Sequence, residues 1–180
     1  MKGILFVEFI EFLEMHTDLG TAQEIINQAE LDSLGAYTRV GLYDYQELIK
    51  LLVSAANRLD LSSDELLDRY TEHLMGAFHR DYPDFFDGAT CAADILKNLD
   101  SHIHVQVQKL LYPDAESPSF DYQVIDGRIH LEYKSPRPLA AVAQSLTLAC
   151  IKHFATGERI IDAHIAENGK SAKFIIERIV

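Results

Sequence analysis

The stretch that decides the fold runs from Ser119 to Arg137 and reads SFDYQVIDGRIHLEYKSPR. Two strand-like runs, 119–125 and 128–135, flank the dipeptide Asp126-Gly127. This dipeptide is typical of the tight turns that join neighbouring antiparallel strands. The stretch therefore predicts a β-hairpin.

Side chains alternate between the two faces of a strand, so the second strand of this hairpin has two distinct faces. One face begins apolar and ends polar: Ile129, Leu131, Tyr133, Ser135 and Arg137. Two hydroxyls and a guanidinium that point inward need acceptors, because burying them unpaired costs about 1–3 kcal/mol each. The pattern predicts a clamp for a carboxylate or a phosphate. The alternative is a strand end that simply reaches solvent, since Pro136 and Pro138 interrupt strand pairing there.

A second hairpin is predicted near the C-terminus, where 159–166 and 172–180 flank a turn containing Asn168-Gly169, and one helix, 139–155, lies between the hairpins. The first hundred residues read instead as helices, among them 4–17, 64–80 and 91–111, the last with Thr90 as N-cap. Pairs with capping-box spacing mark three helix starts: Thr21 and Glu24, Asp44 and Glu47, Ser62 and Glu65. The sequence predicts an α+β fold, with an N-terminal helical lobe and a C-terminal lobe of packed helices and about four antiparallel strands.

The chain of 180 residues suits a single domain, with a helical part at about 1–60 and an α/β part at about 61–180. Its net charge of −12 opposes a phosphate-neutralising surface, so no nucleic-acid partner is expected. No run approaches the roughly 20 apolar residues of a membrane span. Two cysteines without a C-x-x-C pair indicate a reducing cytoplasm. The many Asp and Glu residues are expected on outer, solvated helix faces.

Two histidines, His102 and His104, fall on the predicted helix 91–111. At about 100° per residue they project to opposite sides of its apolar stripe, so one helix cannot present both to the same metal ion. In one interpretation both are ordinary surface histidines. In another, one of them is a ligand in a non-haem metal-dependent enzyme, with Asp100 four residues before His104 as a partner.

Motifs spread over the whole chain resemble the haem-nitric oxide/oxygen binding (H-NOX) family, which includes the sensor domain of soluble guanylate cyclase. They are Met1-Lys2-Gly3, Tyr82-Pro83-Asp84-Phe85-Phe86, Leu99-Asp100 to His104, Tyr112-Pro113, Ser117-Pro118-Ser119-Phe120 and, above all, Tyr133-x-Ser135-x-Arg137. The last triplet matches the family's Y-x-S-x-R motif, which binds the haem propionates. The chain is similar to the stand-alone bacterial members of this family.

This resemblance implies a haem b that lies between the two lobes. It implies that His104 is the proximal iron ligand, because the family's ligand sits just before an alternating apolar segment, as His104 does. His102 stays open as the ligand, since the alignment leaves one extra residue between Asp100 and His104. The resemblance assigns the propionates to Tyr133, Ser135 and Arg137, and it places Pro118 among the haem-binding residues.

The positions on the distal side of the haem imply which gas is bound. Oxygen-binding members of the family carry a distal tyrosine, tryptophan and asparagine, which align with Val142, Phe9 and Leu74. Together with Phe78 and Leu146 these residues would form a dry pocket. Bound O₂ gathers negative charge and gains from a hydrogen-bond donor, whereas NO needs none. The resemblance therefore implies a ferrous haem that binds NO, and CO more weakly, and excludes O₂.

By the same resemblance the chain is a sensor and not an enzyme. NO would weaken the contact of His104 with iron and release the long helix, and a partner that distinguishes the two shapes would respond. The expected partner is a histidine kinase or a cyclic-di-GMP enzyme. No structural zinc site is expected, because 162–173 contains no cysteine. A haem-free adaptor that docks through the acidic first half is a further alternative to the non-haem enzyme.

Overall fold

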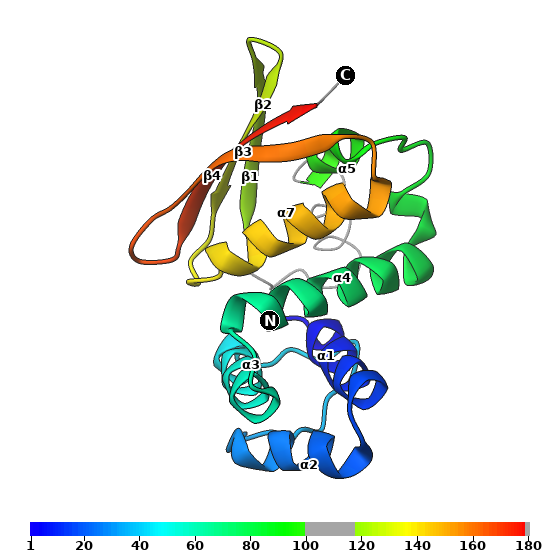
Figure 1. Ribbon diagram of the computed structural model, residues 1–180, viewed down its shortest axis with the longest axis vertical. Helices are drawn as coiled ribbons and strands as arrows, with labels where there is room; N and C mark the ends of the chain where they lie inside the picture. Colours follow the sequence, from blue (N-terminus) through cyan, green and yellow to red (C-terminus); the bar gives the residue numbers. More distant parts are fainter. Residues whose placement is uncertain (100–117, 179–180) are drawn as a thin grey trace. The chain divides into compact units, whose positions relative to one another are not determined.

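The computed structural model describes residues 1–99 and 118–178. Within them lie six α-helices and one four-stranded antiparallel sheet, which confirms the predicted α+β fold (Figure 1). The chain divides into two compact units, Met1–Ala77 and Phe78–Val180. The prediction of one domain whose helical part ends near residue 60 stays a prediction.

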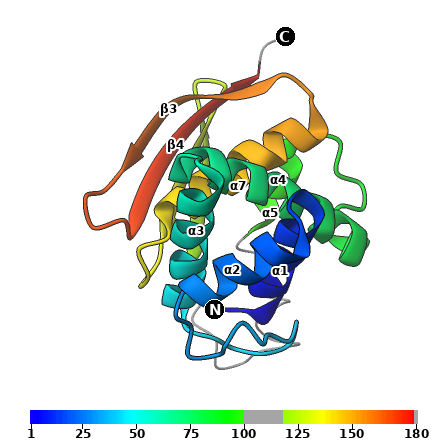
Figure 2. The same ribbon diagram turned by 60° about the horizontal axis from the view of Figure 1, so that its bottom comes forward.

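The first unit is helical. It contains α1 at Gly3–His16, α2 at Leu19–Gln28 and α3 at Tyr45–Leu59, together with most of α4, which spans Ser63–Asp81. Helix α2 packs against both α1 and α3 (Figure 2). Large side chains that are almost completely excluded from solvent form the core of this unit: Phe6, Phe9, Leu13, Ile25, Leu48, Leu51, Leu66, Tyr70 and Leu74.

Local polar groups set the helix starts. Ser62 and Glu65 form the predicted capping box, in which the Glu65 carboxylate accepts from the Ser62 N–H at 3.1 Å. Asp44 caps α3 as predicted. The predicted start of α2 is wrong, because Asp18 and not Thr21 is the N-cap, and the Thr21 N–H donates to its carboxylate at 3.0 Å. A charged carboxylate is the better acceptor at the positive end of a helix.

The second unit contains the sheet, in the order β1-β2-β4-β3. The strands are β1 at Ser119–Ile125, β2 at Arg128–Lys134, β3 at Glu158–Ile165 and β4 at Ser171–Arg178, all paired antiparallel. Both predicted hairpins are confirmed. In the first turn Asp126 and Gly127 have φ values of 51° and 75°, the positive angles for which an Asp-Gly turn is suited.

The two faces of the sheet differ. Leu131, Phe174 and Ile176 point to one face and are completely buried. Helix α7, at Ala140–Phe154, packs against β2, β3 and β4 (Figure 1). The opposite face is wet and carries ion pairs between strands, among them Lys173 with Glu132 and Arg159 with Glu177, each at 2.6 Å. The apolar side of the sheet together with α7 therefore forms the core of this unit.

The second unit begins within α4, and after that helix come a 3-10 turn, Pro83–Phe85, and the short helix α5 at Ala92–Asn98. The predicted N-cap Thr90 is wrong by one residue, because Cys91 occupies that position. The Asp94 carboxylate accepts from the backbone N–H of both Thr90 and Cys91, which draws the cap one residue further along the chain. The remainder of the predicted helix 91–111 lies outside the described residues.

Candidate functional site

The predicted anion clamp begins with Tyr133 on β2. Its side chain is 3% exposed and points to the apolar face of the sheet, as the period-2 pattern predicts. Burial raises the pKa of Tyr133, while the neighbouring Ser135 hydroxyl and the positive charge of Arg137 act in the opposite direction. Tyr133 is therefore the buried member of the predicted clamp, and its action together with Ser135 and Arg137 on one anion stays a prediction.

The backbone after β2 keeps Ser135 and Arg137 close to the end of that strand. Strand β2 ends at Lys134, and the Ser135 N–H then donates to the carbonyl of Lys170 at 2.8 Å. The Ser135 Oγ accepts from the Arg137 N–H at 3.0 Å, which folds the chain into a tight turn before α7. Ser135 and Arg137 are only half-buried. The clamp thus combines one buried donor with two donors at the end of the sheet.

The neighbours of Tyr133 fix the position of its ring. Phe120 on β1 and Ala172 on β4 face it across the sheet. The rings of Phe120 and Tyr133 lie 5.2 Å apart between centroids, and the small Ala172 leaves room on the other side. Pro118 directly precedes β1 and is half-buried. The Tyr133 hydroxyl is consequently held near the end of the sheet where Ser135 and Arg137 follow.

Three of the predicted distal residues belong to the same unit as the clamp. Val142 and Leu146 lie one turn apart on α7, and Phe78 lies on the last part of α4. All three are half-buried. The ring of Phe78 contacts that of Tyr82 at 6.5 Å between centroids. These side chains offer apolar surface and no hydrogen-bond donor.

The other two predicted distal residues, Phe9 on α1 and Leu74 on α4, belong to the helical unit, and both are 0% exposed. The Phe9 ring meets that of Tyr70 edge-on at 5.0 Å between centroids. The Tyr70 hydroxyl donates its hydrogen bond to the carbonyl of Leu5, which lies in the same helical unit. Burial, and then the charge of Glu8, raise the pKa of Tyr70 well above its ordinary value and keep that proton bound.

The predicted iron ligand His104 and its alternative His102 lie outside the described residues, and both stay predictions. Of the predicted helix 91–111 that carries them, the structure describes only the part up to Leu99, in which α5 spans Ala92–Asn98. The gathering of the five distal residues in one dry pocket also stays a prediction, because these residues are divided between the two units.

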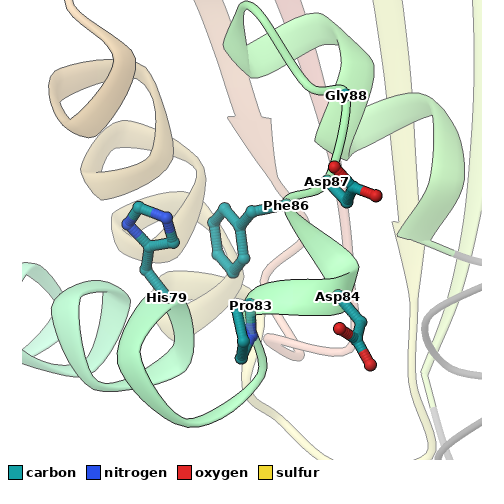
Figure 3. Close-up of a pocket in the computed structure, with 6 residues that line it drawn as sticks. All are labelled: His79, Pro83, Asp84, Phe86, Asp87 and Gly88. Atoms are coloured by element: carbon teal, nitrogen blue, oxygen red, sulfur yellow. The ribbon is translucent and has the colours of Figure 1, made fainter.

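Two features of the structure were not expected from the sequence. The first is a surface pocket in the second unit, lined by His79, Pro83, Asp84, Phe86, Asp87 and Gly88. Figure 3 shows the rings of His79 and Phe86 facing one another, while the carboxylates of Asp84 and Asp87 point away. The only signal in the sequence is the Tyr82 to Phe86 turn, which indicates the family and says nothing of a cavity.

The second unexpected feature is Glu8, a carboxylate with 0% exposure in the apolar helix α1. Arg39 and His73 contact its two oxygens. The sequence-based expectation that acidic residues lie on outer helix faces is wrong at this position. Helical periodicity alone could not reveal the reason, since the compensating Arg39 comes from the loop between α2 and α3.

Among the described residues, no helix combines the length and the apolar character that a membrane span requires.

Comparison with known proteins agrees with these observations. The family model described as Haem-NO-binding matches residues 2–160. The H-NOX protein from K. algicida, solved in the unliganded Fe(II) state, is 35% identical and has a TM-score of 0.87, over 100% of this chain and 97% of that chain. The H-NOX from Shewanella woodyi, in the Fe(II)CO state with IWP-051 bound, is 30% identical with a TM-score of 0.81, over 99% and 95% of the two chains.

The H-NOX protein from S. oneidensis, in the Fe(II)NO state, has a TM-score of 0.86 over 100% of both chains, and at 21% identity it supports the fold alone. No curated protein matches the chain. The family model and the two more similar structures cover nearly the whole sequence. On this evidence the chain belongs to the haem-NO-binding, or H-NOX, family.

Proposed function

We propose that this protein is a haem-based gas sensor that binds nitric oxide at a ferrous haem b and signals to a partner protein. The observation that carries the proposal is the burial of Tyr133 on β2, followed directly by the turn that holds Ser135 and Arg137, in a member of the haem-NO-binding family. When bound, the haem supplies an iron atom that coordinates a diatomic gas. The residues of the chain hold it, shield it from water and read out its state.

The donor set suits a haem by its chemistry. Haem b carries two propionate carboxylates, and a buried carboxylate needs donors that compensate its charge. Arg137 can offer two parallel N–H groups to one carboxylate, while Tyr133 and Ser135 each offer a hydroxyl. A non-covalent haem b is favoured over a haem attached by thioethers, because the chain has two cysteines and no C-x-x-C-H motif. Pro118, next to β1, is proposed to contact the haem edge.

His104 is the proposed iron ligand, on the predicted helix 91–111. Within that range the structure describes α5, whose start is well anchored because the Asp94 carboxylate accepts from the N–H groups of Thr90 and Cys91 at 2.8 and 3.2 Å. We expect a displacement of His104 to be transmitted along the predicted helix. The proposed readout is therefore a change of helix position relative to the clamp residues.

The distal residues favour NO and CO over O₂. Phe9, Leu74, Phe78, Val142 and Leu146 carry no polar group, and the buried Tyr70 already donates its proton to the Leu5 carbonyl. Bound oxygen depends on a distal donor more strongly than NO or CO does. We expect NO to bind, CO to bind more weakly, and O₂ to be excluded.

The proposed partner is a separate histidine kinase or a cyclic-di-GMP enzyme in the cytoplasm. Gas binding can regulate such a partner only if the partner has different affinities for the two states of the sensor. The acidic first half of the sequence would steer association with a basic surface. We expect no chemical turnover by the chain itself.

No described residue favours the two alternatives. The non-haem metal-dependent enzyme would use His102 or His104 as a ligand, and neither lies in the described residues. Among the described residues, the one group with three potential metal ligands is Glu8, Glu11 and His73, and Arg39 contacts both of its glutamates. In the haem-free adaptor, the predicted anion clamp of Tyr133, Ser135 and Arg137 would have no anion to bind.

Replacement of His104 by Gly in the haem-loaded protein tests the proposal, with His102→Gly as the matched control. We expect His104→Gly to abolish the five-coordinate ferrous absorption spectrum, and exogenous imidazole to restore it by filling the space of the lost side chain. The His102→Gly variant should keep the spectrum. If His102→Gly alone abolished it, the ligand assignment would be wrong.

A further inference from the structure

The helical unit contains a completely buried acidic side chain, Glu8, that the proposed function does not use and that its surroundings hold tightly. Glu8 is 0% exposed, yet it lies between the apolar residues of α1. An Arg39 guanidinium nitrogen lies 2.6 Å from its Oε1, and His73 Nε2 lies 3.1 Å from its Oε2. A carboxylate can only accept, so the His73 ring donates from Nε2. Each oxygen of Glu8 is therefore bonded to a different segment of the chain.

The arrangement is an ion pair and not a metal site. Glu8, Glu11 and His73 have ligand atoms within 4.8 Å of one another, which alone would suit a divalent cation. However, the same Arg39 nitrogen that contacts Glu8 also lies 3.2 Å from Glu11. A guanidinium placed between two carboxylates already supplies the positive charge that a cation would bring.

The loop that carries Arg39 is itself fixed to the start of α1. The Gly3 N–H donates to the Gly41 carbonyl at 2.8 Å, and the Gly41 N–H donates to Thr38 at 3.0 Å. A Cβ at Gly3 would lie 1.8 Å from the Thr38 carbonyl oxygen, so the close approach of the loop requires glycine there. The Arg39 side chain thus projects from a loop whose backbone is held in place by hydrogen bonds.

Glu8 and His73 are direct chain neighbours of Phe9 and Leu74, which are both 0% exposed. Successive residues of a helix are about 100° apart and share a rigid backbone, so a bond that fixes one also fixes the direction of the next. Ring contacts strengthen the link between the two helices. Phe12 on α1 meets His73 on α4 at 5.8 Å between ring centroids.

We propose that Arg39 and His73, bonded to the buried Glu8 carboxylate, form with it a charge clamp that positions Phe9 and Leu74, and through them sets the shape of the gas-binding side of the haem. Glu8, Arg39 and His73 are positioning residues, since none of them is proposed to touch the gas. The role of Phe9 and Leu74 rests on the proposed function. The clamp itself rests on contacts within the helical unit alone.

The test uses the full-length, haem-loaded ferrous–CO protein and three variants. His73→Phe removes the bond to Glu8 and keeps a ring against Phe12, and Glu8→Gln removes the charge and keeps the shape. Glu24→Gln is the matched control, because it breaks an exposed ion pair with Arg58 in the same unit. For each protein the haem content, the melting temperature, the CO dissociation rate, the C–O stretching frequency and the methyl NMR signals of Leu74 are measured.

We expect His73→Phe and Glu8→Gln to keep one haem per chain, to raise the CO dissociation rate at least threefold, to shift the C–O stretch and to move the Leu74 methyl signals. Glu24→Gln should match the wild type in all five readouts. The proposal is overturned if both clamp variants melt earlier but keep the wild-type C–O stretch, CO rate and methyl signals, which would make the role merely structural. It is equally overturned if neither variant differs from the wild type.

The same measurements separate this proposal from the proposed function. If the wild-type protein took up no haem, the proposed function would fail at the haem content, and the assignment of Phe9 and Leu74 to a gas-binding pocket would fail with it. A wild type that binds haem and CO, together with clamp variants that leave the pocket readouts unchanged, would refute the clamp alone.

Discussion

Two ion pairs of equal length lie in different surroundings. In the helical unit Arg39 lies 2.6 Å from Glu8, and on the wet face of the sheet Lys173 lies 2.6 Å from Glu132. The side chain of Glu8 is 0% exposed and that of Glu132 is 33% exposed. Attraction between charges strengthens as water is excluded, and removal of one buried partner leaves the other uncompensated. Equal distances therefore correspond to unequal contributions to stability.

The two units are stabilised in different ways. The helical unit depends on a compensated charge inside its core as well as on apolar packing. In the sheet unit the ion pairs between strands lie on a solvated face, while Leu131, Phe174 and Ile176 supply the buried surface on the other, and Glu158 at the start of β3 is a buried carboxylate. Substitutions that break the pair of Glu8 with Arg39 should consequently have large effects, and those on the solvated face of the sheet small effects.

The largest expected effect follows from Arg39→Ala, which removes the guanidinium that lies 2.6 Å from the buried Glu8 carboxylate. Breaking a buried pair costs about 3–5 kcal/mol, and we expect about 3 kcal/mol because water can partly replace the 39% exposed Arg39 side chain. Urea unfolding monitored by circular dichroism measures the change. Arg58→Ala, which breaks the exposed pair with Glu24, is the control. Equal losses in the two variants would refute the contrast between buried and exposed charge.

A smaller effect is expected from Tyr133→Phe, which removes an uncharged buried donor from the sheet unit. The loss of one hydrogen bond to a propionate is worth about 1.4 kcal/mol, which corresponds to a roughly tenfold faster loss of haem. Transfer of haem to an excess of apomyoglobin measures the rate. Tyr122→Phe, on the neighbouring strand, should leave the rate unchanged. If both substitutions accelerated haem loss equally, Tyr133 would have no special role in the predicted anion clamp that it forms with Ser135 and Arg137.

Glu47 is a second buried carboxylate of the helical unit, and hydrogen bonds from Ser33 and Tyr37 compensate its charge more strongly than the cation of Lys50 does. Burial alone would raise its pKa, but hydrogen bonds from Ser33 and Tyr37 outweigh burial and hold the pKa below the ordinary value of 4.5. A depressed pKa means that these bonds stabilise the fold above pH 4.5 and lose this contribution as the pH falls through the folded-state pKa.

We therefore expect Ser33→Ala to lower the free energy of unfolding by about 1 kcal/mol at pH 7 and by less in acid. Urea unfolding of the variant and the wild type between pH 3 and pH 7 measures the difference. Thr21→Ala, which removes an exposed partner of Asp18 in the same unit, is a control for acid effects at a solvated carboxylate. A difference between wild type and Ser33→Ala that grew toward low pH would contradict the sign of the shift.

The smallest effect is expected from Glu132→Gln on the wet face of the sheet. Exposed ion pairs contribute little, because water and salt screen the charges and the side chains lose freedom when they pair. The melting temperature should equal that of the wild type within error, at low and at high salt. If Glu132→Gln destabilised the protein as much as Arg39→Ala does, exposed and buried ion pairs would not differ in their contribution to stability.

Much of the fold could be predicted from the sequence, because the signals are local. The Asp126-Gly127 turn takes two positive φ angles that this pair adopts readily, and Ser62 with Glu65 closes a capping box within one helical turn. The errors are of the same local kind. Asp18 and not Thr21 caps α2, and Cys91 and not Thr90 caps α5, and in both cases a nearby carboxylate accepts from the backbone N–H of the predicted cap residue.

The site could be predicted in part. The alternation along β2 correctly places Tyr133 inside and Lys134 outside, because a strand has a fixed period of two. The burial of Glu8 could not be predicted, since it depends on Arg39, 31 positions away, and on His73, 65 positions away. The surface pocket beside Phe86 depends on the contact of His79 with that ring and has no sequence signature. Contacts between distant segments are decided by packing, which a single sequence does not reveal.

The most direct test of the central claim is the absorption spectrum of the purified, reduced, haem-reconstituted protein, recorded under argon, in air and after addition of NO. The account predicts the Soret band of a five-coordinate ferrous haem under argon, the absence of an oxygen complex in air and a shifted band with NO. A protein that stayed colourless after reconstitution, or one that formed a stable oxygen complex in air, would contradict it.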